Sequence, residues 1–187
     1  MLDTAIREIS ELVERGYELS VAVNFSMKQF HDELLLDKTY QTLRRYNFPP
    51  ELFILEMTES TLMENPEKTI VILNQLRSLG VKIAIDDFGT GYSSLKYLIE
   101  FNVDKIKIDK SFTISMLKNL KAWNIVKTII ELTHSIDALT LAEGVETEEL
   151  LRELVKLHCD EGQGYYFSPP LSFEKLIELL KRGVYFH

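Results

Sequence analysis

Short apolar segments alternate with amphipathic segments along this chain, and the alternation restricts the folds that it can adopt. Six apolar segments have the length of strands, and segments with helical periodicity separate them. A succession of strand–helix units is typical of a parallel sheet that is covered by helices. We therefore predict an α/β fold.

The element boundaries follow from apolar periodicity and from turn and capping residues. The predicted strands cover residues 19–25, 52–57, 81–85, 103–108 and 138–142, with a last short strand inside 159–167. The predicted helices cover residues 3–15, 29–46, 66–79, 119–135, 147–157 and 172–181, and one more helix follows the turn at residues 89–91. We expect Asn65, Thr147 and either Ser93 or Ser94 to be N-caps, and Gly16 and Gly80 to end helices.

With 187 residues, the chain is predicted to be one domain that spans residues 1–187. Its units could form an open doubly wound sheet or a β/α barrel. A closed (β/α)8 barrel needs eight strands and roughly 250 residues, so about six units leave this chain two strands short. We expect an N-terminally truncated TIM-like barrel whose missing strands precede the opening helix.

The composition predicts a soluble globular protein, with 45% hydrophobic and 27% charged residues. A net charge of −8 disfavours a broad basic surface for DNA or RNA, although it permits a phosphate ligand held through metal ions. Cys159 is the single cysteine, which excludes an internal disulfide and favours a reducing compartment. No uncharged stretch reaches the roughly 18 residues of a membrane span, and the first residues do not resemble a signal peptide. We therefore expect a cytoplasmic protein without a membrane segment.

The segment from Ile83 to Leu95 combines a strand, two adjacent carboxylates and a glycine-rich turn. Asp86 and Asp87 follow the predicted strand, and their charges would repel each other unless a cation lies between them. Hard divalent metal ions meet that need, because they prefer oxygen ligands. Taken alone, the pair fits a strand end and turn better than a site, since Asp is a common turn residue.

Polar residues stand at or near the C-terminal ends of all six predicted strands. In a parallel barrel these ends lie on one face, where active sites of this architecture are built. Each residue alone is compatible with a cap, a turn or a solvated surface, but their coincidence on six successive strands favours a site. The residues are Asn24, Glu56, Asp86, Asp87, Lys107, Glu143 and Gln163.

This set of residues predicts a two-metal centre for phosphoryl chemistry. Four carboxylates and an amide oxygen are hard ligands that suit two Mg²⁺ or Mn²⁺ ions. Two ions roughly 4 Å apart would clamp the attacking and leaving oxygens and lower the pKa of a bridging water. Lys107 could hydrogen-bond that water or neutralise the developing charge.

Three other kinds of site are disfavoured. The turn at Gly89 and Gly91 lacks the third glycine of a dinucleotide-binding fingerprint, and no Gly-Lys-Ser or Gly-Lys-Thr phosphate loop occurs. The four histidines are not spaced as a zinc-binding pair.

Six segments around the predicted site carry a resemblance to a known family. They are VNFS (23–26), LEMTES (55–60), DDFGTGYSSL (86–95), KIKIDKSF (105–112), AEGVET (142–147) and QGYYF (163–167). In order and in sequence, they closely resemble the motifs of the EAL-domain cyclic di-GMP phosphodiesterases. The resemblance spans nearly the full chain and implies a modified (β/α)8 barrel that hydrolyses cyclic di-GMP to linear pGpG with two Mg²⁺ or Mn²⁺ ions.

The resemblance also implies roles for the catalytic and metal-binding residues. Lys107 would act on the attacking water, and Gln163 would position water. Asp87 would be a metal ligand or a partner of metal-bound water. The metal ligands that the resemblance implies are Asn24, Glu56, Asp86 and Glu143.

A loop and a dimer contact follow from the same resemblance. Glu59 would tie down the loop after Asp87, which contains Gly89, Thr90 and Gly91. In the family, this region also contributes to a homodimer.

The chain departs from the family at its N-terminus. The Glu-Ala-Leu signature, whose glutamate is a metal ligand, and an arginine used on the substrate phosphate belong to the family's first two strands, which are missing. We therefore expect the 187-residue chain alone to have impaired activity. We also expect an upstream domain to regulate it.

A non-catalytic module that binds cyclic di-GMP or another protein is the alternative. The retained Asp86, Asp87, Lys107 and Glu143 weigh against it, because a scaffold has no physical need to hold acids together.

Overall fold

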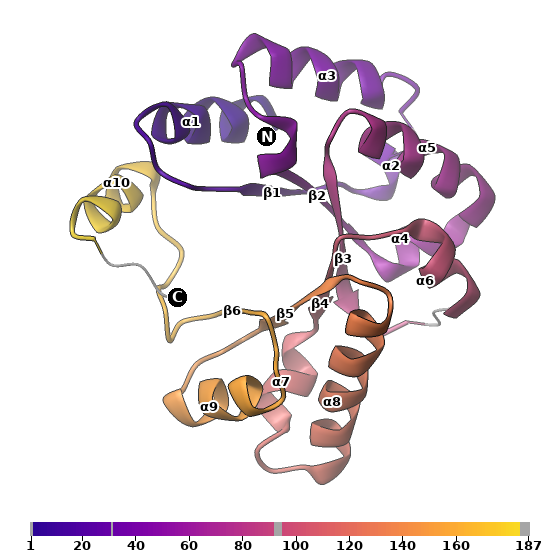
Figure 1. The fold of residues 1–187 in the computed structure, drawn as a ribbon, viewed down its shortest axis with the longest axis vertical. Coiled ribbons are helices and arrows are strands. Elements are labelled where there is room, and N and C mark those ends of the chain that lie inside the picture. The colour runs from indigo at the N-terminus through magenta and orange to yellow at the C-terminus, as the bar shows by residue number, and fades with distance from the viewer. Residues whose placement is uncertain (1, 31, 92–94, 184–187) are drawn as a thin grey trace.

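The protein is a curled parallel sheet with its helices on the outer side (Figure 1). The computed structural model describes residues 2–30, 32–91 and 95–183, so the N-cap predicted at Ser93 or Ser94 lies outside the described residues. The strands are β1 (Val21–Asn24), β2 (Phe53–Thr58), β3 (Lys82–Phe88), β4 (Lys105–Ile108), β5 (Leu139–Glu143) and β6 (Glu161–Gln163). The helices are α1 (Leu2–Glu14), α2 (Met27–Phe30), α3 (Leu35–Arg45), the 3₁₀ helix η1 (Pro50–Leu52), α4 (Glu59–Glu64), α5 (Pro66–Ser78), α6 (Leu95–Phe101), α7 (Lys110–Ser115), α8 (Leu120–Ser135), α9 (Glu148–Lys156) and α10 (Phe173–Lys181).

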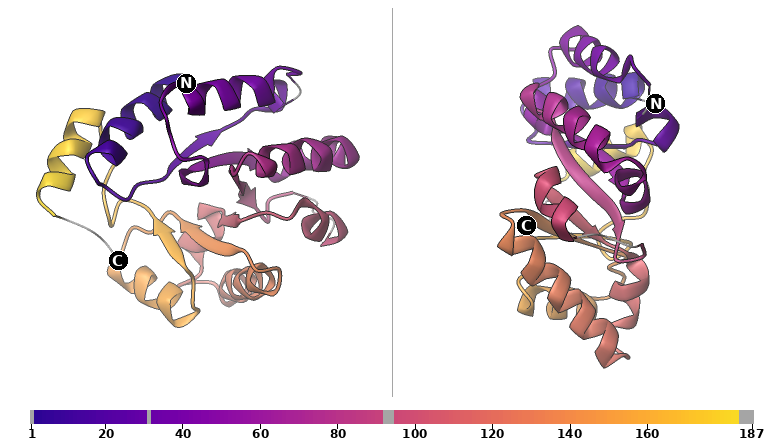
Figure 2. Two further views of the ribbon diagram at one scale, coloured as in Figure 1. Left: turned by 45° about the horizontal axis from the view of Figure 1, so that its top comes forward. Right: turned by 90° about the vertical axis from the view of Figure 1, so that its right-hand side faces the viewer.

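The strand order in the sheet is the order in the sequence, β1-β2-β3-β4-β5-β6, and every neighbouring pair is parallel. A doubly wound sheet reverses its strand order at a switch point, so this topology decides between the two architectures that the sequence left open. The sheet is an incomplete barrel of six strands, and α10 lies beside the space between β1 and β6 in two views (Figures 1 and 2).

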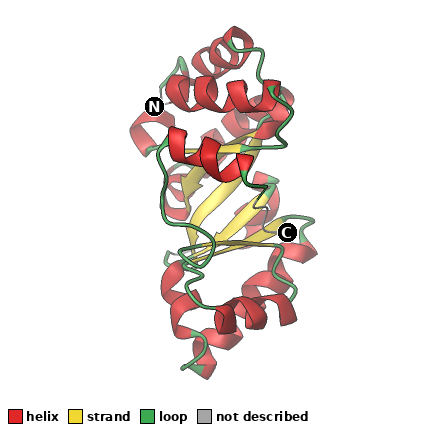
Figure 3. Cartoon of the chain, turned by 90° about the vertical axis from the view of Figure 1, so that its left-hand side faces the viewer, coloured by secondary structure: helices red, strands yellow, loops and turns green. Residues whose placement is uncertain are grey.

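The apolar core lies between the convex face of the sheet and the helices that surround it (Figure 3). Side chains alternate between the two faces of each strand. On β4, Ile106 and Ile108 are fully buried on the helix-covered face, so Lys105 and Lys107 lie on the concave face. The same alternation applies along β2, where Leu55 and Met57 are fully buried on either side of Glu56.

The predicted capping residues are confirmed where the structure describes them. The side chain of Asn65 accepts a hydrogen bond from the Lys68 N–H at the start of α5, and Thr147 caps α9 by accepting from the Leu150 N–H. Gly80 follows α5 with φ of +92°, a conformation that side chains with a Cβ rarely adopt.

Two short helices were missed because each begins directly after a strand. The hydroxyl of Thr58 caps α4 and the carboxylate of Asp109 caps α7, so each side chain turns the chain into a helix within one residue of the strand end. The helix predicted over residues 29–46 is wrong as one unit. It divides into α2 and α3, and the Asp32 carboxylate between them accepts from the Leu34 N–H.

The strand predicted to end at Ile85 continues through the aspartate pair to Phe88. Its pairing with β4 shifts register between Ile85 and Phe88, and Asp87 has φ of +53°. This irregularity directs the two carboxylates to one region instead of to opposite faces of the sheet.

Two aspartates fasten the strands at their N-terminal ends. Asp104 Oδ2 accepts from the Ile83 N–H at 2.9 Å and pairs with Arg77 Nη1 at 2.5 Å. Asp160 Oδ2 accepts from both the N–H (2.8 Å) and the hydroxyl (2.7 Å) of Thr140, and lies 2.8 Å from His134 Nε2. Each carboxylate therefore joins a strand to its neighbour and to the helix before it.

Within the described residues, every helix is too short or too polar to cross a lipid bilayer.

We expect Asp160→Ala to lower the free energy of unfolding by about 1–2 kcal/mol at pH 7, because the buried Thr140 loses its acceptor. Burial raises the pKa of Asp160, but the hydrogen bonds from Thr140 and His134 outweigh it and lower the pKa below 3.8. The stabilisation is therefore complete above about pH 4 and disappears as the pH falls through the lowered pKa.

Urea denaturation of both proteins at pH 7 and at pH 3 measures this difference. Asp160→Asn keeps one acceptor oxygen and should lose less stability. A difference between wild type and Asp160→Ala that grows as the pH falls would contradict the assignment.

Candidate metal centre

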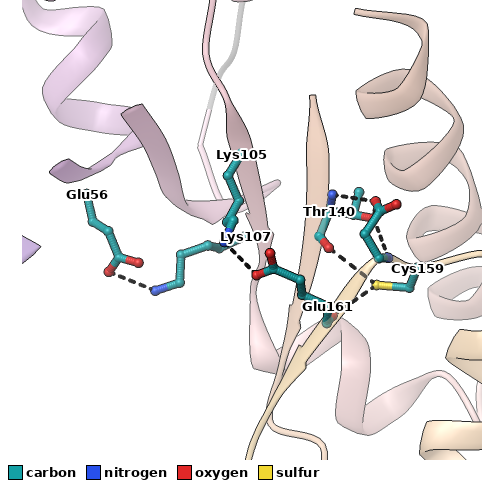
Figure 4. A network of polar contacts seen from close by, with 7 residues as sticks. Glu56, Lys105, Lys107, Thr140, Cys159 and Glu161 are labelled. Atoms are coloured by element: carbon teal, nitrogen blue, oxygen red, sulfur yellow. Dashed lines mark hydrogen bonds and ion pairs between the residues drawn. The ribbon is translucent and has the colours of Figure 1, made fainter. Parts of the chain in front are cut away.

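The ammonium group of Lys107 lies among three carboxylates from three other strands. Its Nζ is 2.8 Å from Asp86 Oδ1, 2.8 Å from Glu143 Oε1 and 3.1 Å from Glu56 Oε2. The Lys107 side chain is only 5% exposed, and the Glu56 side chain is 9% exposed. Figure 4 shows Lys107 and Glu56 reaching toward each other across the concave face.

Burial and charge oppose each other at this cluster. Burial lowers the pKa of Lys107, but its hydrogen bonds with Asp86 and Glu143 and the charge of Glu56 raise the pKa above its ordinary value. Lys107 is therefore a cation at neutral pH. Burial raises the pKa of Glu56, and Lys107 offsets part of that shift.

Asp86, Asp87 and Glu143 offer a second arrangement of oxygen atoms. One carboxylate oxygen from each lies within 4.8 Å of the other two. Burial, followed by the charge of Asp86, raises the pKa of Asp87. Crowded carboxylates gain from a nearby cation, because it offsets their mutual repulsion, and a set of carboxylate oxygens suits a hard divalent ion. These residues fit the metal that the sequence predicted.

Asn24 and Gln163 flank the cluster through strand register. Asn24 is the pairing partner of Glu56 on the neighbouring strand, and Gln163 is the pairing partner of Glu143. All seven predicted residues therefore lie at the same end of the sheet. Four of them, Glu56, Asp86, Lys107 and Glu143, are in direct contact around one ammonium group.

The loop after Asp87 is held by a buried carboxylate. Glu59 is 3% exposed, and its Oε2 accepts from the N–H groups of Gly89 (3.1 Å) and Gly91 (3.3 Å). A Cβ on Gly91 would lie 2.8 Å from Glu59 Oε1, so the backbone approaches the carboxylate closely. The Thr90 hydroxyl donates to the Asp87 carbonyl at 2.8 Å and closes the turn.

A second ion pair on the concave face was not predicted from the sequence. Lys105 Nζ, on β4, lies 2.5 Å from Glu161 Oε2, on β6, and so spans β5 (Figure 4). Lys105 precedes Lys107 by two residues, and Glu161 precedes Gln163 by two. Residues two apart on a strand point to the same face, so this spacing could have predicted that Lys105 and Glu161 share the face of Lys107 and Gln163.

A family model described as EAL domain matches residues 1–170 of the chain. The chain is 39% identical over 180 residues to the signaling protein YkoW of Bacillus subtilis, covering 95% of this chain and 22% of that protein. It is 38% identical over 182 residues to the cyclic di-GMP phosphodiesterase NbdA of Pseudomonas aeruginosa, covering 97% of this chain and 23% of that protein. The chain thus spans about a quarter of the length of these relatives.

Solved structures agree with these matches. A structure of the PaMucR phosphodiesterase in complex with c-di-GMP superposes with a TM-score of 0.91 at 39% identity, covering 94% of this chain and 71% of that chain. The EAL domain of Mycobacterium smegmatis DcpA superposes with a TM-score of 0.91 at 33% identity, covering 97% of this chain and 82% of that chain.

We expect Glu59→Ala to loosen the turn after Asp87 and to cost about 2 kcal/mol of stability, because two backbone N–H groups lose a buried acceptor. Hydrogen exchange of a peptide covering residues 87–91, followed by mass spectrometry, should become faster. Glu59→Gln is the matched control, since it keeps the length and one acceptor oxygen, and should exchange at an intermediate rate. Unchanged exchange in Glu59→Ala would show that the carboxylate does not hold the turn.

Proposed function

Because this chain belongs to the EAL domain family, we propose that it is a metal-dependent phosphodiesterase that hydrolyses cyclic di-GMP to linear pGpG. The observation that carries the proposal is the convergence of Asp86, Asp87 and Glu143, with Lys107 and Glu56, at the C-terminal end of a parallel sheet. Sites of barrel enzymes lie at this end. A purely structural role does not require carboxylates to be gathered against their mutual repulsion.

Two Mg²⁺ or Mn²⁺ ions would be held by Asn24, Glu56, Asp86, Asp87 and Glu143. Bound divalent cations supply Lewis acidity and lower the pKa of coordinated water. Water would add its oxygen to one phosphorus atom while the bond from that phosphorus to the 3′ oxygen breaks. The single linear product would carry a new 5′-phosphate and a new 3′-hydroxyl, whose oxygen takes up a proton from the water.

Lys107 and Gln163 would act on the water and on the charge that develops. In the free protein the carboxylates around Lys107 keep it protonated at neutral pH, so it would donate a hydrogen bond to water or neutralise negative charge. Gln163 lies on β6 as the register partner of Glu143, from where its amide could orient a water. Glu59 would act indirectly, by holding the turn of Gly89 to Gly91 beside Asp87.

We expect purified chain with Mn²⁺ to convert cyclic di-GMP to pGpG, and a chelator to abolish the reaction. Asp86→Asn should reduce turnover by about a hundredfold or more, because it removes charge that acts on the reacting centre. Glu131→Gln, on the exposed side of α8, is the matched control and should keep wild-type turnover. Chromatography of the nucleotide products measures both.

One outcome would decide for the binding module over the enzyme. Metal-independent binding of cyclic di-GMP without any product, measured by calorimetry and chromatography, would favour the non-catalytic module.

We expect the rate of cyclic di-GMP hydrolysis to be below that of a complete EAL domain, since β1 and β6 each have one neighbour among the described strands. A rate equal to that of a complete domain would contradict this impairment.

We also propose that copies of the chain pair through the region after Asp87 and that other parts of a longer protein regulate it. The helix α6 in this region exposes two apolar side chains, Leu95 (58%) and Ile99 (67%). Exposed apolar groups on one short helix favour association.

If α6 is the dimer contact, Ile99→Lys should shift the protein toward monomer in sedimentation velocity experiments. Val71→Lys, at an exposed apolar position on α5 (57% exposed), is the control and should leave the association unchanged. Association that is identical in wild type and Ile99→Lys would exclude α6 as the contact.

A further inference from the structure

The ammonium group of Lys107 and the candidate metal site share two carboxylates. Asp86 and Glu143 each place an oxygen 2.8 Å from Lys107 Nζ, and both belong to the trio of oxygens within 4.8 Å that suits a metal ion. The same two carboxylates therefore pair with the ammonium group of Lys107 and would also bind a divalent metal ion from solution.

Lys107 balances part of the negative charge of the carboxylates around it. Glu56, Asp86 and Glu143 are less than 20% exposed as side chains, and Lys107 contacts all three. Carboxylates removed from water need a counter-charge. Lys107 supplies one positive charge from within the fold, at hydrogen-bond distance from each of them.

We propose that Lys107 is an internal counter-ion that competes with divalent cations for Asp86 and Glu143, so that metal binding displaces its ion pairs. This inference rests on the proposed function only in that the cluster binds a divalent cation. It assigns Lys107 a role in the free protein, apart from any action on substrate. The competition keeps the carboxylates in place at low metal concentration and weakens the apparent metal affinity.

Lys105 provides a matched control for this proposal. It lies on the same face of β4, two residues before Lys107, and its side chain is 12% exposed. Its ammonium pairs with Glu161 and not with the three carboxylates around Lys107. Removal of either lysine deletes one positive charge on the concave face, but only the removal of Lys107 frees Asp86 and Glu143.

The test is the binding of Mn²⁺ alone, measured by isothermal calorimetry without nucleotide. Lys107→Met should bind Mn²⁺ about tenfold tighter than wild type or more, because the competing cation is gone. Lys105→Met should stay within about threefold of wild type, as expected for a charge that is screened and farther away. An affinity of Lys107→Met that is unchanged, weaker, or matched by Lys105→Met would overturn the proposal, as would a wild type and variant that both fail to bind Mn²⁺.

Two further measurements keep the test decisive if Lys107→Met does not fold. Lys107→Arg keeps a positive charge, so its Mn²⁺ affinity should equal or fall below that of wild type, and tighter binding would contradict competition. In wild type, saturating Mg²⁺ should shift the ¹⁵N NMR signal of the Lys107 ammonium, and an unchanged signal would also overturn the proposal. Neither readout involves cyclic di-GMP, so absent hydrolysis would refute the proposed function and leave the competition intact.

Discussion

The contact of one buried ammonium group with three carboxylates is the interaction on which the site depends. Lys107 draws together Glu56, Asp86 and Glu143, which come from strands β2, β3 and β5. Carboxylates on neighbouring strands would otherwise repel one another. The cluster can persist in the free protein because the counter-charge belongs to the chain, and the same geometry makes that charge a competitor for any metal ion.

The two faces of the sheet carry different kinds of side chain, and its two ends carry different contacts. The convex face is apolar and packs against the helices, while the concave face carries Lys105, Lys107 and their partners. At the N-terminal ends of the strands, Asp104 and Asp160 join neighbouring strands and helices. The opposite end is left for the site and for a turn that Glu59 holds.

Much of the fold could be predicted because the chain alternates its local signals strictly. Apolar periodicity located the six strands and most of the long helices, and caps such as Asn65 and Thr147 marked helix starts. The short helices α4 and α7 escaped prediction, since each follows a strand with no intervening turn. The continuation of β3 through Asp87 escaped it too, because a positive φ at an aspartate leaves no pattern in the sequence.

The choice of candidate site residues, and their position at the ends of strands, follow from the amino-acid order, because strand ends and residue types are local properties. Their contacts do not follow from it. The pairing of Lys107 with all three carboxylates, and the link from Lys105 to Glu161 across β5, depend on strand register and on the curl of the sheet. Tertiary structure decides these contacts because parallel neighbours are joined only through long crossovers, which leave no local trace of which side chains will meet.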